Sequence, residues 1–276
     1  MTVTDFFEAW DLFRDAVLTG VIAGSALGLL GVFIVLRRMV FVTAAITQSA
    51  GFGVVLGFWI GMMTGTEVDP VFWAVGVSQL AAAVFAINPA RVHLSRESIL
   101  ALVWLVGSGG AILLGDRIAA EAHDVKAILF GTAVLVRPED LVAVGAVGTL
   151  AIVGVLLARR GLVFVGVDPD GARVQKVPVR LLELGFLALV TLVASVATRA
   201  LGALPVFAFS VLPAMAALLA TRRLNVALIL ALVGGGLAAF LGYLGAFLWD
   251  FPVGAAQAAT ALVFVLLALP FRLLRG

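Results

Sequence analysis

Nine long apolar runs constrain the fold of this 276-residue chain more than any other feature. They lie at roughly 16–36, 40–63, 71–88, 98–115, 141–158, 181–201, 204–220, 225–248 and 253–272. Each is near the length of about 20 residues that a helix needs to cross a bilayer, and a helix satisfies its own backbone in lipid. The sequence therefore predicts an all-α, polytopic membrane protein with about nine transmembrane helices, within a range of eight to ten. We expect a single transmembrane domain over residues 1–276.

Composition supports this and excludes several classes of protein. The chain is 63% hydrophobic and only 12% charged, with a mean hydropathy of +1.20. A soluble enzyme or a nucleic-acid-binding protein could not hide so much apolar surface from water. The chain has no cysteine and no Gly-x-x-x-x-Gly-Lys-Ser/Thr loop, so it should not hydrolyse ATP or bind a cofactor by itself.

The distribution of charge predicts the topology. If the N-terminus is outside and the loops alternate, 13 of the 18 basic residues fall inside. They are Arg37, Arg38, Arg91, Arg96, Arg159, Arg160, Arg173, Lys176, Arg180, Arg222, Arg223, Arg272 and Arg275. Cytoplasmic loops carry such an excess of Lys and Arg. We therefore expect nine spans with the N-terminus outside and the C-terminus cytoplasmic.

The external connection over residues 116–140 is too long to be a simple turn. It contains the apolar stretch 127–136, which is too short to span and predicts a re-entrant or interfacial segment. Hard oxygen ligands and one imidazole also gather in this loop, at Asp116, Glu121, His123 and Asp124. They could hold a cation weakly, or they could keep the loop solvated or meet a partner.

The longest cytoplasmic loop covers residues 159–180. Asp168 can cap a short helix, Pro169 suits its first turn, and Pro178 would end it. Such a helix is either a docking element or part of a solvated loop.

Polar residues inside the spans are candidates for a translocation path, because they are costly in lipid. The main candidates are Thr43, Thr47, Gln48, Ser49, Ser210 and Gln257. The alternative for each one is a hydrogen bond between helices.

Five motifs in a fixed order resemble the membrane permease subunit of bacterial ABC importers of the zinc, manganese and iron type. They are Gly28–Val42 with its Arg-Arg-Met, Leu129-Phe-Gly131 followed by Arg137–Asp140, Asp168–Arg173 followed by Val177-Pro-Val179, Leu201–Leu204 followed by Leu212-Pro-Ala214, and Asp250-x-Pro-x-Gly254. The resemblance runs over nearly the whole chain.

The resemblance implies a bacterial inner-membrane protein that pairs as a homodimer around a central path. A cytoplasmic ATPase subunit, which binds ATP and Mg, would dock on a coupling helix, and an external solute-binding protein would deliver a divalent metal ion. The coupling residues would be Asp168, Pro169, Asp170, Gly171, Ala172, Arg173 and Val177.

One departure from the family pattern concerns the metal path. Where members carry an Asp and a His after the first Arg pair, this chain has Ala44 and Gln48. An amide oxygen is a poor ligand for a transition metal. Three explanations remain open: a metal passes with few ligands, the cargo is a chelate or another solute, or the chain is a non-transporting regulatory partner of an ATPase.

Two other classes have little support. An intramembrane enzyme would need a nucleophile with its base, or a pair of metal ligands, within the spans. A secondary transporter usually carries an ionisable residue at mid-membrane. Neither pattern is evident in the apolar runs.

Overall fold

The computed structural model describes residues 2–66, 68–85, 95–118 and 136–273. The helices, in chain order, are α1 (Val3–Glu8), α2 (Trp10–Leu36), α3 (Val40–Thr64), α4 (Pro70–Phe85), α6 (Arg96–Gly115), α8 (Pro138–Val167), α9 (Pro169–Val174), α10 (Val179–Leu201), α11 (Ala203–Ala220), α12 (Leu224–Trp249) and α13 (Val253–Leu273). Within these ranges, eight helices are long and apolar enough to cross a membrane. A ninth apolar helix, α4, has 16 residues.

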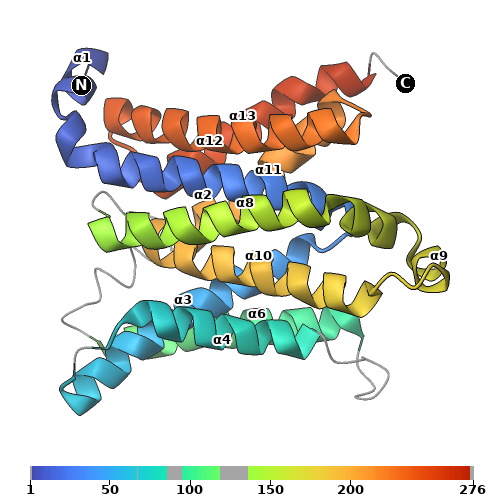
Figure 1. Cartoon of the computed structure of the whole chain (residues 1–276). Coiled ribbons are helices and arrows are strands. Elements are labelled where there is room, and N and C mark those ends of the chain that lie inside the picture. The colour runs from blue at the N-terminus through green and yellow to red at the C-terminus, as the bar shows by residue number, and fades with distance from the viewer. Residues whose placement is uncertain (1, 67, 86–94, 119–135, 274–276) are drawn as a thin grey trace.

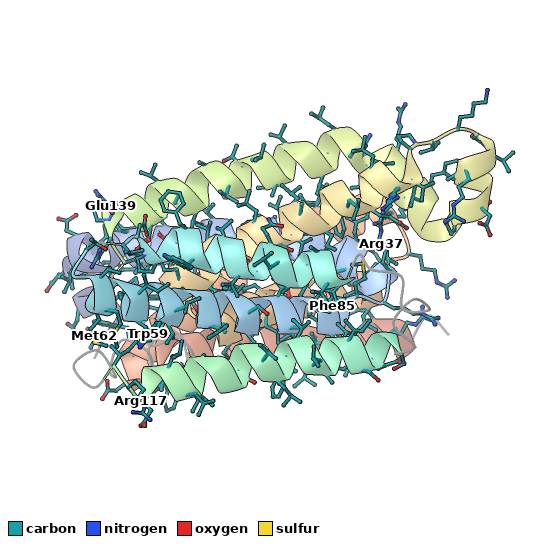
Figure 2. The ribbon with its side chains drawn as sticks, turned by 90° about the horizontal axis from the view of Figure 1, so that it is seen from below. Arg37, Trp59, Met62, Phe85, Arg117 and Glu139 are labelled. Atoms are coloured by element: carbon teal, nitrogen blue, oxygen red, sulfur yellow. The ribbon has the colours of Figure 1, made fainter. Side chains whose placement is uncertain are left out.

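The long helices lie side by side as one bundle (Figure 1). The helix α1 lies at one end of the bundle, and α9 lies at the other end together with the last turns of α13. Figure 2 shows Arg37 and Phe85 toward the α9 end, and Trp59, Met62, Arg117 and Glu139 toward the opposite end. Because α1 and the last turns of α13 lie at opposite ends of the bundle, the chain crosses the bundle an odd number of times.

At the centre of the bundle is α2, which packs against α8, α10, α11 and α12. Its contact with α12 is backbone against backbone. A Cβ added at Gly28 would lie 2.2 Å from the Ala231 carbonyl oxygen, and one at Gly235 would lie 2.0 Å from the Gly24 carbonyl oxygen. Small residues permit this close approach, which provides van der Waals packing where no hydrophobic force acts between helices.

All nine predicted apolar runs correspond to helices, and the differences lie at their ends. The run ending near residue 158 continues as helix to Val167, so much of the predicted loop 159–180 is the end of α8. Pro178 does not end α9; it precedes the first turn of α10. The predicted re-entrant stretch 127–136 lies, apart from its last residue, outside the described residues.

Candidate functional site

The predicted path residues on α3 lie on two different faces of that helix. Thr43, Thr47 and Ser49 are buried, with 1–3% of their surface exposed. Their hydroxyls donate to the carbonyl oxygens of Val40, Ala44 and Ala45 at 2.7, 2.9 and 2.9 Å. The polar groups are therefore satisfied by their own helix, and these side chains face the interior of the subunit.

The second face of α3 is its accessible stripe, which we define as Ala44, Gln48, Phe52 and Leu56. Between Thr43 and Gly57, these four residues are the positions that are not buried. They recur at every fourth residue and so share one side of the helix. Gln48 supplies the only polar side chain of the stripe, and it is the position where the resemblance expects a histidine.

Close packing against α6 borders the accessible stripe. A Cβ added at Gly107 of α6 would lie 2.9 Å from the Gln48 carbonyl carbon, and one at Gly110 would lie 2.8 Å from the Phe52 ring. Two glycines thus allow α6 to approach the α3 backbone where Gln48 emerges. This close packing fixes the α3 backbone from which the Gln48 side chain extends.

Ser210 and Gln257 contact different helices. Ser210 on α11 is 1% exposed; its Oγ lies 3.3 Å from Thr43 Oγ1 and 2.7 Å from the Phe207 carbonyl oxygen. Gln257 on α13 is also 1% exposed, and its Nε2 donates to the Ala239 carbonyl oxygen on α12 at 3.2 Å. The structure therefore brings Ser210 to Thr43 and places Gln257 in a separate contact with α12.

The predicted short helix after the fifth run is present as α9. The Asp168 carboxylate caps it by accepting a hydrogen bond of 2.8 Å from the Gly171 N–H, and Pro169 opens its first turn. Ala172, which is fully buried, anchors α9 in a small cluster with Val165 and Val179. Capping and anchoring make α9 an ordered element.

The C-terminal end of α9 is followed by Lys176, which has a positive φ of 60°. The N–H of Val177 donates to the Ala172 carbonyl at 3.0 Å, and the N–H of Lys176 donates to the Arg173 carbonyl at 3.0 Å. This pair of bonds is a Schellman closure. Arg173 and Asp170 form an exposed ion pair of 2.7 Å on α9.

Arg37, which follows the last turn of α2, contacts α8 and α10, a role that the sequence analysis did not predict. Its Nη2 donates to the Leu162 carbonyl oxygen on α8 at 3.0 Å, and its Cζ lies 4.9 Å from the centre of the Phe186 ring on α10. Burial lowers the pKa of Arg37, while the carboxylate of Glu183 acts in the opposite direction. These contacts of Arg37 could not be predicted from the sequence, because its partners are more than 120 residues away along the chain.

Arg199 lies in the last turn of α10, at the opposite end of the bundle, and was not among the candidate residues from the sequence. It forms an ion pair with Asp140 in the first turn of α8, and the two side chains are only 11% and 10% exposed. The pair joins the last turn of α10 to the first turn of α8. No local pattern indicates this contact between residues 59 positions apart.

The predicted weak cation site in the external loop cannot be assembled from the described residues. Asp116 follows the last turn of α6, whereas Glu121, His123 and Asp124 lie outside the described residues. Elsewhere in the described ranges, no three His, Asp or Glu side chains come together in a way that could hold a metal ion.

The fold defines a polytopic helical membrane protein that carries a capped, exposed helix beyond one end of its bundle. Comparison with known proteins is consistent with this class. The structure superposes on a chain of PsaBC from Streptococcus pneumoniae, solved in complex with Fab, with a TM-score of 0.87, 24% identity and 100% coverage of both chains.

The chain belongs to the ABC 3 transport family, whose model matches residues 9–272. It is 27% identical to the manganese import system permease protein ScaB of Streptococcus parasanguinis, over 96% of this chain and 94% of the relative. It is 25% identical to the chelated iron transport system membrane protein YfeD of Yersinia pestis, over 95% of this chain and 86% of the relative. The family predicted from the five motifs is confirmed.

Proposed function

We propose that this chain is the membrane permease subunit of an ATP-driven importer for a divalent metal ion of the manganese, iron or zinc class. The observation that carries the proposal is the family match over residues 9–272, because it covers nearly all of the given sequence. The relatives are named for manganese and for chelated iron. This chain would form the path and would not itself be catalytic.

The proposed topology places the α9 end of the bundle in the cytoplasm. Arg37, Arg159, Arg223 and Arg272 lie at or near the helix ends on that side, as the positive-inside rule requires of a cytoplasmic face. In a bacterial inner membrane, this orientation turns α1 outward, toward a solute-binding protein. Two copies of the chain would pair around the path.

The proposed partner on the cytoplasmic side is an ABC ATPase that holds ATP and Mg and docks on α9. The helix suits this role because Ala172 fixes it to α8 and α10 while Asp170 and Arg173 stay exposed. A rigid element can transmit a push from the ATPase into the bundle.

Removing the cap of α9 tests the docking proposal. Asp168→Ala deletes the acceptor for the Gly171 N–H, and we expect about five-fold weaker binding of the ATPase, since an N-cap contributes about 1 kcal/mol. Asp168→Asn keeps an acceptor oxygen and is the matched control. Pull-down of the ATPase with the purified permease measures both. If Asp168→Ala binds as the wild type does, α9 is not the docking element.

The accessible stripe provides the test of the path. Gln48→Leu removes the one polar side chain of the stripe, and we expect uptake to fall about ten-fold, the effect of one lost hydrogen bond of roughly 1.4 kcal/mol. Thr47→Val is the matched control, since the Thr47 hydroxyl already donates within α3 and faces the subunit interior.

Uptake of Mn²⁺ is measured in liposomes that contain the permease, its ATPase and its binding protein. Normal uptake by Gln48→Leu would remove Gln48 from the path.

A second candidate function is an importer of the same architecture for a chelated or non-metal solute. It is favoured by the replacement of an acid and a histidine by Ala44 and Gln48, since no strong metal ligand then lies on the stripe. ATP-dependent uptake of a chelate without uptake of the free ion would support it over the metal proposal.

A further inference from the structure

Two basic grooves lie at the α9 end of the bundle, on the flank formed by α8 and α12. The first, of about 490 Å³, lies between these helices and is lined by Arg159, Arg160 and Phe164 from α8 and by Leu224, Asn225 and Leu228 from α12. The second, of about 570 Å³, is formed by Thr221, Arg222, Arg223 and Val226 around the start of α12. Four arginines therefore border two grooves whose lining contains no acidic residue.

The depth of the arginines along the bundle matches a membrane interface. The 21 residues from Pro138 to Ala158 rise by about 32 Å, close to the roughly 30 Å thickness of the hydrocarbon core. Arg159 and Arg160 follow directly, so they fall at headgroup depth. On the facing side, Arg222 and Arg223 immediately precede the first turn of α12.

The groove between α8 and α12 is amphipathic. Both helices pack on α2, and Figure 1 shows them on either side of it. The rest of the lining is apolar apart from Asn225: Val163 and Phe164 follow the arginines toward the α9 end of α8, and Leu228 lies one turn further into the bundle than Leu224. A soluble anion would contact only the arginines, whereas a ligand with an acyl chain directed toward the bilayer centre would also contact Leu228.

We propose that this groove binds an acidic phospholipid, with the phosphate between Arg159 and Arg160 and an acyl chain that runs along Leu228 toward the bilayer centre. Guanidinium groups bind phosphate oxygens through charged, often bidentate hydrogen bonds. Basic pockets between transmembrane helices bind the headgroups of anionic lipids. Arg222 and Arg223 extend the positive potential toward the same headgroup layer.

Competition between two lipids tests the site on the full-length permease. The purified chain is mixed with equal amounts of phosphatidylglycerol and phosphatidylcholine, and native mass spectrometry counts the bound lipids. We expect the wild type to retain phosphatidylglycerol in preference. The double variant Arg159→Gln/Arg160→Gln should weaken that preference by about twenty-five-fold, roughly five-fold for each arginine near a lipid surface.

Two further variants distinguish lipid binding in the groove from general electrostatic attraction to the basic end of the bundle. Arg272→Gln removes an exposed cation at the same end of the bundle, outside both grooves, and should leave the preference within about two-fold of the wild type. Asn225→Trp keeps every arginine but fills the groove, and should reduce phosphatidylglycerol retention like the double variant. An equal loss in Arg272→Gln, or full retention in Asn225→Trp, would overturn the proposal.

The same purified permease can also reveal other occupants of the groove. Displacement of phosphatidylglycerol by an equal concentration of glycerol phosphate would identify a soluble phosphate as the ligand and overturn the lipid site. The native chain has no cysteine, so Asn225→Cys is a clean probe for a second copy. Disulfide-linked dimers of Asn225→Cys would show that another protomer covers the groove, which would also overturn the proposal.

Discussion

Two segments of this chain have nearly the same sequence and different structures. Val-Leu-Arg-Arg-Met-Val-Phe-Val occupies residues 35–42, and Leu-Ala-Arg-Arg-Gly-Leu-Val-Phe-Val occupies residues 157–165. The first pair, Arg37 and Arg38, ends α2 and turns the chain into α3. The second pair, Arg159 and Arg160, lies inside α8, which continues to Val167.

The first segment stops because its backbone closes on itself. Arg38 adopts a positive φ of 57°, and the N–H of Met39 donates to the Ile34 carbonyl at 2.9 Å. Met39 then packs against the main core. The turn is a Schellman closure with an arginine where glycine is usual.

The second segment continues although it contains the better stop signal, Gly161. A Cβ at Gly161 would lie 2.9 Å from Leu182 Cδ1, so the missing side chain lets α10 approach α8. Glycine serves here as a packing residue rather than as a cap. The comparison teaches that an Arg-Arg pair near a membrane surface does not determine whether the helix ends: a local closure ends the first segment, and close packing against α10 accompanies the continuation of the second.

The largest expected difference between the two pairs is in stability. Arg37→Ala removes the hydrogen bond to the Leu162 carbonyl and the contact with the Phe186 ring, and we expect a loss of about 2–4 kcal/mol. Arg159→Ala, at an exposed position of α8, should change the free energy of unfolding by less than about 0.5 kcal/mol. Denaturant unfolding in detergent measures both, and equal losses would contradict the comparison.

Glycine substitutions should have smaller effects of opposite sign. Arg38→Gly relieves a positive φ and should stabilise the protein by about 0.5–1 kcal/mol. Arg160→Gly places glycine in the interior of a helix and should destabilise it by about 1 kcal/mol. The same unfolding assay applies, and two changes of the same sign would show that the segments are equivalent.

The candidate site was only partly predictable from sequence. Thr43, Thr47 and Gln48 are neighbours along the chain and share a polar character, so composition groups them. Helical periodicity separates them, because Gln48 lies with Ala44 on the accessible stripe and the two threonines face inward. Predicting which face is inward needs the positions of α6 and α11, and these come from contacts such as Gly107 against Gln48 and Ser210 near Thr43.

The helix α9 shows the opposite case. Asp168, Pro169 and Gly171 interact within a single turn, so the cap was predictable from the residues alone. Its anchoring was not, because Ala172 meets Val179 from the next helix. Interactions within the segment stabilise α9, and packing against the next helix determines its position.

The sequence by itself determined that this protein is a nine-segment helical membrane protein of a transport family, because apolar length, charge sidedness and short motifs are all local properties. The tertiary structure alone decided which polar residues are exposed, where Arg37 and Arg199 find their partners, and which helices leave an arginine-lined groove. These features depend on distances between residues far apart in the chain. Such distances follow from how glycines and small side chains allow the helices to approach, and no single segment carries that information.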